Sequence, residues 1–165
     1  MKYLRGCKIN IKNVADDFYE AYQRCLESKE PIINENITIS KIVAIPAFVN
    51  GMFACELYLK CLIGNKEIEG DRHNLKLLFD NLDDKHKEKI KAVPITEYNF
   101  EELLEELSDG FKTWRYIYED ENEKFGNGNP FKKTEEFLRI YLPVLKDITN
   151  DFYNEQKNKC HNEEV

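Results

Sequence analysis

Glu56 and Lys60 are the two side chains whose placement most suggests chemistry. They lie one helical turn apart inside residues 44–63, AIPAFVNGMFACELYLKCLI, the longest mostly apolar stretch of the chain. At about 100° per residue, Glu56 falls inside the apolar sector of a helix and Lys60 falls at its edge. An isolated carboxylate in a protein core is costly and normally acquires a partner or a proton. The spacing therefore predicts that Glu56 is buried and paired.

Candidate partners for this carboxylate lie in two other parts of the chain. His73 lies at the start of a predicted short helix, and Arg115 lies at the border of the apolar stripe predicted for residues 99–121. Tyr118 lies inside that stripe, and Glu119 lies one turn beyond Arg115. We therefore expect a hydrogen-bonded polar cluster that joins three helices and is drawn from Glu56, Lys60, His73, Arg115, Tyr118 and Glu119.

Two roles are open for such a cluster. It could be structural and fix the register of the helices. It could also be a ligand or catalytic site with shifted pKa values, because carboxylates, histidine and arginine in one cleft are the groups that such sites use. A third outcome is that these side chains do not meet at all.

Other patterns that carry chemistry are missing from the sequence. It contains no G-x-x-x-x-G-K-[ST], G-x-G-x-x-G, H-E-x-x-H or G-x-S-x-G motif. The cysteines are scattered, odd in number, and form no C-x-x-C motif or Cys/His cluster. We expect buried, reduced thiols and neither a metal site nor a cofactor. The cysteines are Cys7, Cys25, Cys55, Cys61 and Cys160.

The elements that must position the cluster are predicted to be helices. Only 7 Gly and 5 Pro in 165 residues argue against an all-β fold rich in turns. Apolar residues recur at intervals of three and four in several segments. We expect an all-α fold: a helical bundle of four main helices plus short helices, within one domain that spans residues 1–165. The main helices are expected over 13–28, 44–63, 99–121 and from about 130 onward, with short helices near 75–82 and 83–91.

The two ends of the chain are expected to be less regular than the rest of this bundle. Residues 1–12 are predicted to form an irregular lead-in, and residues 155–165 a frayed, flexible tail. His86, which has no partner in the sequence, is expected at the surface.

Charge and hydropathy limit where the protein can be located and what it can bind. A net charge of −7 argues against generic nucleic-acid binding, which depends on neutralising phosphates. Residues 97–123 hold ten acids against two bases, which indicates either a solvated helix face or a surface that meets a basic protein. Glu56, Lys60 and Asn50 would be costly in lipid, and no secretory signal is evident. We therefore expect a cytoplasmic protein that does not enter a membrane.

Three short motifs occur in an order that resembles a HEPN domain. They are Glu56-Leu-Tyr-Leu-Lys60, then His73-Asn-Leu75, then Arg115-Tyr116-Ile-Tyr118-Glu119. The chain is most similar to the abortive-infection-like subset whose helices carry E-L-x-L-K, H-N-L and R-Y-x-Y-E. The resemblance covers residues 44–121 and marks as signature positions Glu56, Lys60, His73, Arg115, Tyr116 and Glu119.

The resemblance implies a helical bundle that commonly pairs into a homodimer. Such domains occur in toxin–antitoxin, abortive-infection and other prokaryotic defence systems, often as metal-independent ribonucleases or beside a nucleotidyltransferase. The ribonuclease members carry Arg, four to six intervening residues, and then His. The corresponding positions after Arg115 are Asp120, Glu121 and Asn122, so the usual histidine is missing. Gly70 is also displaced from the position just before His73.

The preferred hypothesis is a non-catalytic, HEPN-like module of a defence or toxin–antitoxin type system. It would form a homodimer and bind a nucleotide, RNA or a protein partner such as a nucleotidyltransferase or an antitoxin. Tyr116 lies opposite the predicted core stripe and could serve the dimer interface. One alternative is a divergent endoribonuclease that uses Arg115, Glu119 and His73 as catalytic residues. Another is a structural or regulatory bundle whose acidic face binds protein.

Overall fold

The computed structural model describes residues 2–27, 40–93, 98–116 and 130–162. Every regular element among these residues is an α-helix, so the predicted all-α bundle is confirmed. The helices are α1 (Lys2–Glu27), α2 (Ser40–Ile63), α3 (Leu75–Asp80), α4 (Asp84–Lys91), α5 (Phe100–Glu106), α6 (Gly110–Arg115) and α7 (Pro130–Asn162).

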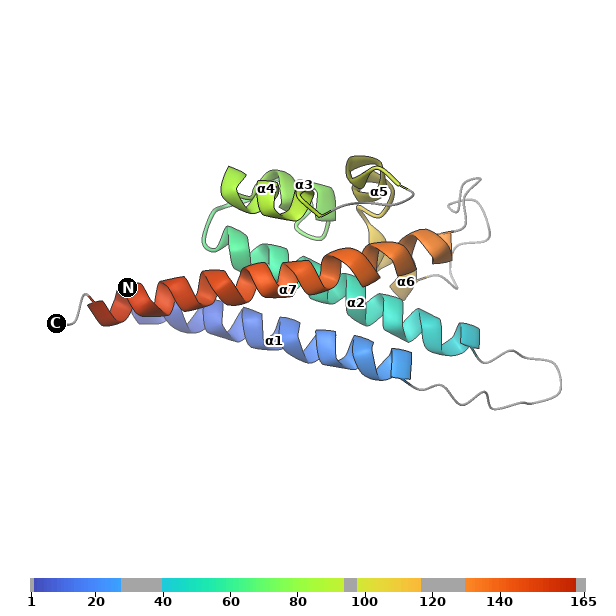
Figure 1. Ribbon diagram of the computed structural model, residues 1–165, viewed down its shortest axis with the longest axis horizontal. Helices are drawn as coiled ribbons and strands as arrows, with labels where there is room; N and C mark the ends of the chain where they lie inside the picture. Colours follow the sequence, from blue (N-terminus) through green and yellow to red (C-terminus); the bar gives the residue numbers. More distant parts are fainter. Residues whose placement is uncertain (1, 28–39, 94–97, 117–129, 163–165) are drawn as a thin grey trace.

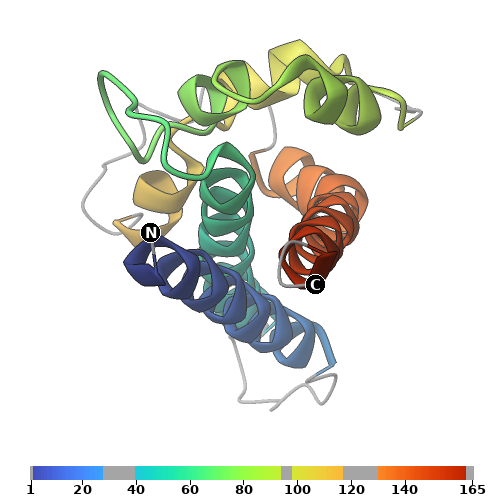
Figure 2. The same cartoon turned by 90° about the vertical axis from the view of Figure 1, so that its left-hand side faces the viewer.

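The three long helices α1, α2 and α7 run along the length of the molecule, as Figure 1 shows. α1 is antiparallel to both α2 and α7, so the first turn of α1 and the last turn of α7 lie at the same end. The short helices α3, α4 and α5 form a layer on one side of this bundle (Figure 2). α2 contacts α1, α3, α6 and α7, and it is therefore the central helix of the fold.

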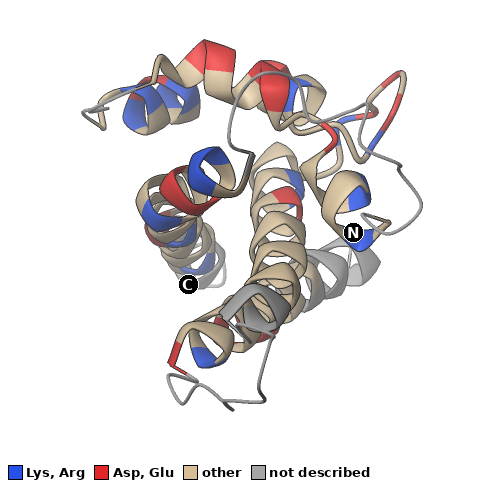
Figure 3. Ribbon diagram, turned by 90° about the vertical axis from the view of Figure 1, so that its right-hand side faces the viewer, with Lys and Arg blue, Asp and Glu red and all other residues tan. Residues whose placement is uncertain are grey.

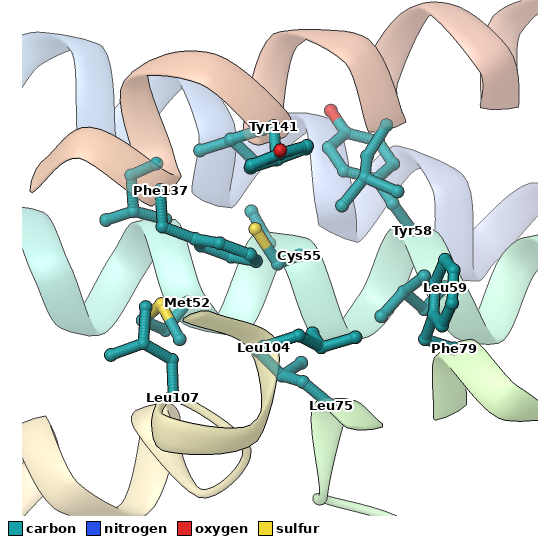
Figure 4. Packing of buried hydrophobic residues seen from close by; sticks show 14 of the residues in the cluster. Met52, Cys55, Tyr58, Leu59, Leu75, Phe79, Leu104, Leu107, Phe137 and Tyr141 are labelled. Atoms are coloured by element: carbon teal, nitrogen blue, oxygen red, sulfur yellow. The ribbon is translucent and has the colours of Figure 1, made fainter. Parts of the chain in front are cut away.

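The core is built around the apolar surface of α2 (Figure 4). Met52, Cys55 and Tyr58 are each 0% exposed, on successive turns of this helix. Gly51 marks the closest approach of its neighbours. A methyl group added at Gly51 would meet Leu138 Cδ1 of α7 at 2.8 Å. α7 can thus pack on the α2 backbone itself at this point, and the dense interior leaves little room for a larger residue.

α2 also has the length and composition of a membrane-spanning helix over Ala44–Ile63. Within its most apolar window, 61% of the residues are buried inside the fold. A buried core helix satisfies the same test of length and hydropathy, so this feature is weak evidence for a membrane span.

Both ends of the chain differ from the prediction. α1 begins at Lys2, so residues 2–12 are helical and the expected irregular lead-in is wrong. α7 continues to Asn162, so residues 155–162 are helical where a frayed tail was expected. Each end extends a helix whose apolar face is already packed, because α1 and α7 both lie against α2. Helical stability in proteins comes mostly from such packing rather than from local propensity.

The predicted helix over residues 99–121 is also wrong in its continuity. Asn99 caps its start as expected, since its side chain accepts a hydrogen bond from the backbone N–H of Glu101 at 2.8 Å. The helix then ends after Glu106 and resumes as α6 at Gly110. The Ser108 carbonyl accepts a hydrogen bond from Leu75 N–H at 2.7 Å, which draws this turn toward α3. The break between α5 and α6 therefore depends on tertiary contacts, which hydrophobic periodicity in the sequence does not reveal.

Gly110 explains where the second segment can begin. A methyl group at this position would meet the Met52 Cε atom at 2.0 Å, so the backbone of α6 lies directly against α2. Glycine allows this approach because it has no Cβ.

Candidate functional site

Glu56 lies fully buried on α2 and has two donors on the same oxygen. The Lys60 ammonium donates a hydrogen bond to Glu56 Oε1 at 2.6 Å, and His73 Nδ1 lies 3.0 Å from that oxygen. Because an ionised carboxylate only accepts hydrogen bonds, the imidazole donates to it through Nδ1. The prediction that Glu56 is buried and paired is confirmed.

The three side chains of this cluster differ in their exposure to solvent. Glu56 is 0% exposed, whereas the side chain of Lys60 is 26% exposed and that of His73 is 50% exposed. The second carboxylate oxygen, Oε2, has no hydrogen-bond partner among the residues that the structure describes. The pairing of Glu56 thus depends on two donors that reach it from the protein surface.

The loop between α2 and α3 places His73 over the carboxylate. Gly64 ends α2 with φ of 72°, and Gly70 has φ of 106°, a region that side chains of L-residues rarely adopt. Asp71 Oδ1 accepts a hydrogen bond from the His73 N–H at 3.0 Å. Asn74 then caps α3 by accepting a hydrogen bond from Leu77 N–H at 2.9 Å. These local bonds hold the backbone around His73 in one position.

Asp71 also ties this loop to α6 through an ion pair with Lys112. The hydrogen bond from Lys112 lowers the pKa of the Asp71 carboxyl group, and the same bond raises the pKa of Lys112. The charge of Glu56 acts in the same direction on Lys112, which places this ammonium within the electrostatic reach of the cluster. Sequence reasoning missed both residues because they are 41 positions apart and neither lies on an apolar face.

Arg115 does not join the cluster in the way the sequence predicted. Its guanidinium lies over the Phe111 ring at 5.8 Å and over the Tyr116 ring at 5.3 Å, and it makes no hydrogen bond to Glu56. The turn that separates α5 from α6 breaks the stripe on which the prediction depended, and Arg115 is exposed. Tyr116 is 39% exposed, as expected. Tyr118 and Glu119 lie outside the described residues.

A second polar cluster, which sequence reasoning missed, joins α1 to α2. The Tyr58 hydroxyl donates to Asp16 Oδ1 at 2.8 Å, and the Lys12 ammonium donates to Asp16 Oδ2 at 2.6 Å. Burial, and then the bond to Asp16, raise the pKa of Tyr58. The spacing of four between Lys12 and Asp16 is a helical signal, but it was hidden because residues 1–12 were predicted to be irregular.

The acidic face expected within residues 97–123 is described only in part. Figure 3 shows acidic residues on α5, where Glu101, Glu102, Glu105 and Glu106 are exposed. Two of them are already paired within the chain, because Glu101 forms an ion pair with Lys91 and Glu106 forms one with Lys133. This pairing favours a solvated, internally balanced face over a surface built for a basic protein.

Partly exposed bases lie on the solvent side of the Glu56 cluster, and two of them are already paired with acids: Lys60 with Glu56 and Lys112 with Asp71. Lys60 and His73 reach this side from α2 and the loop, and Lys112 and Arg115 lie one turn apart on α6. Such groups suit an anionic ligand. Among the described residues, no group of three His, Cys, Asp or Glu side chains could hold a metal ion.

Comparisons with known proteins add no further assignment. A scan against protein-family models, and searches of curated proteins and of solved structures, found no match to this chain.

Proposed function

We propose that this chain is a non-catalytic, HEPN-like helical module of a prokaryotic defence or toxin–antitoxin type system. It acts in the cytoplasm, forms a homodimer, and binds a nucleotide or RNA at the basic rim around Glu56. The alternative binding partner is a protein such as a nucleotidyltransferase or an antitoxin. The observation that carries the proposal is a group of partly exposed bases beside the buried Glu56, namely Lys60, His73 and Lys112, with Arg115 one turn from Lys112 on α6, in a chain of net charge −7.

The bases of this rim contrast with the net negative charge of the whole chain. A protein of net charge −7 repels a polyanion in general, so any affinity for nucleic acid must come from a local basic site. Lys112 is 44% exposed, and Arg115 is exposed with its guanidinium stacked on Tyr116. The Arg115 guanidinium offers charge-assisted hydrogen bonds to a phosphate.

The family resemblance supports the same proposal from a separate direction. Two of its three motifs contact each other, because Glu56 and Lys60 come from the first and His73 comes from the second. Residues that are distant in sequence but belong to one motif set are expected to meet in the fold.

The binding site is tested by nucleotide and RNA titrations. We expect Arg115→Ala to weaken binding of a short single-stranded RNA or of ATP roughly 10- to 150-fold, because a charge-assisted hydrogen bond contributes roughly 1.5–3 kcal/mol. Fluorescence anisotropy with labelled ligands measures the change. Lys89→Ala is the matched control, since Lys89 is an exposed base on α4. An equal loss in both variants, or no binding by the unaltered protein, would contradict the site.

The dimer is tested independently by light scattering at high concentration. We expect twice the 19.6 kDa mass of the chain. Tyr116, which is 39% exposed, is the residue through which we expect the interface to form, so Tyr116→Lys should shift the protein toward monomer. A monomer at all concentrations would remove this part of the proposal.

One observation favours a second candidate, a divergent metal-independent endoribonuclease. His73 presents Nδ1 to a buried carboxylate and its side chain is 50% exposed, an arrangement in which a carboxylate can orient a general acid or base. If this candidate is correct, His73→Ala should lower RNA cleavage by about 10²–10⁴-fold. Arg115→Ala should also lower it, through lost phosphate contacts. Equal cleavage by both variants and the unaltered protein would eliminate these roles.

A further inference from the structure

His86 lies in a different place from the one the sequence predicted. It was expected at the surface, but only 7% of it is exposed, because α4 packs against α7. Its ring meets the Phe152 ring edge-on, with centroids 5.5 Å apart. Its Nδ1 atom is buried and has no hydrogen-bond partner among the described residues. The imidazole thus lies in a contact that suits its neutral form.

Charged groups surround this contact from both helices. Asp83, Lys85 and Lys89 lie on the α4 side, and Glu155 and Asp151 lie on α7. Lys85 pairs with Glu155 at 3.5 Å, and Lys89 with Asp151 at 3.8 Å, so the bases and acids largely balance one another.

The net effect of these surroundings is to disfavour the imidazolium ion. Burial is the largest influence and lowers the pKa of His86 below its ordinary value. Lys85 and Lys89 lower it further, whereas Asp83 and Glu155 raise it. An unpaired Nδ1–H in an apolar contact would leave a buried donor unsatisfied, which is costly.

We infer that α4 is a pH-sensitive latch on α7, closed while His86 is neutral and released when His86 takes up a proton. Release would expose Phe152 and the buried face of α4, including Ile90, which is 2% exposed in the closed state. The latch does not depend on the proposed ligand site, because it lies between other elements of the fold.

The sign of the effect follows from proton linkage. The open form of α4 carries a solvated imidazole with an ordinary pKa near 6.5, and the closed form has a lower one. The open form therefore binds more protons at pH values between these two, and closure weakens as pH falls through about 6.5. One proton changes the opening constant by at most about tenfold for each pH unit.

Amide hydrogen exchange tests the latch in the full chain. We expect the opening constant of the Ile90 amide, corrected for the intrinsic exchange rate, to rise between pH 6.5 and pH 5.5, by at most about fivefold. His86→Phe keeps the ring contact with Phe152 and removes the proton site, so this rise should vanish. His73→Gln removes a histidine that lies away from the contact between α4 and α7 and should leave the rise intact. The same pH dependence in His86→Phe as in the unaltered protein would overturn the latch.

A second measurement keeps the test decisive even where His86→Phe does not fold. The imidazole resonances of His86 in the unaltered protein report its protonation directly by NMR. A midpoint below 6.5 supports the latch, and a midpoint at or above 6.5 overturns it.

Discussion

Lys60→Met is expected to lower the free energy of unfolding by about 3 kcal/mol, the lower end of the cost of breaking a buried ion pair. The substitution keeps most of the aliphatic volume and removes one of the two donors to Glu56, which is 0% exposed. His73 still donates to the same oxygen, so the loss falls short of that for a fully unpaired charge. Urea unfolding followed by circular dichroism measures the change.

The partner variant separates loss of the pair from loss of packing. Glu56→Gln in the Lys60→Met background removes the buried charge, and we expect it to recover at least half of the lost stability. Lys66→Met is the matched control, because Lys66 is exposed and its change should fall within about 0.5 kcal/mol of zero. A double variant no more stable than Lys60→Met would contradict a role for the buried charge.

Trp114→Ala is expected to cost about 3–5 kcal/mol, the range for truncating a large buried aromatic residue. Trp114 is 1% exposed and packs between Phe48 of α2, at 4.7 Å, and Phe131 of α7, at 4.8 Å. Its indole N–H donates to Thr134 Oγ1 at 3.1 Å. The residue thus fixes α6 against both long helices. Far-UV circular dichroism must follow the unfolding, since Trp114 is the only tryptophan.

This substitution should also reach the candidate site. α6 carries Lys112 and Arg115, so a loosened α6 should weaken the proposed RNA or nucleotide binding as well as stability. Thr134→Val is the milder control: it removes only the acceptor and should cost about 1–3 kcal/mol by leaving the indole N–H unsatisfied. A Trp114→Ala protein of nearly unaltered stability would show that α6 is held by other contacts.

The helical periodicity of the sequence was sufficient for the fold class and for most of the elements. The apolar stripe of α2, the cap at Asn99 and the two short helices α3 and α4 were all predictable from local pattern. The break between α5 and α6 was not, because it depends on a hydrogen bond from Leu75 to Ser108 and on the contact of Gly110 with Met52. Both contacts join segments far apart in the sequence.

The candidate site was predictable to the same extent. The burial of Glu56 was predictable because this carboxylate lies on an otherwise apolar helix face. Its pairing with Lys60 was predictable from the spacing of four residues. His73 followed from its place beside the loop. The prediction that Arg115 joins the Glu56 cluster was wrong because it relied on an unbroken helix over residues 99–121. The ion pair of Asp71 with Lys112 was missed because hydrophobic periodicity carries no information about exposed ion pairs. The burial of His86 likewise depends on α7, which the charge-rich α4 sequence does not reveal.

The position of Asp71 has a consequence for how the surface and the core communicate. One of its oxygens holds Lys112, and the other holds the backbone N–H of His73, whose ring in turn holds Glu56. A ligand anion that pairs with Lys112 would weaken the ion pair of Lys112 with Asp71. The hydrogen bond that Asp71 accepts from the His73 N–H would then change in strength. By thermodynamic reciprocity, a substitution at Glu56 should then alter ligand affinity at Lys112 by the same factor by which the ligand alters the pairing of Glu56. If the ligand proposal holds, Asp71 would couple a solvent-facing cation to a carboxylate that solvent does not reach.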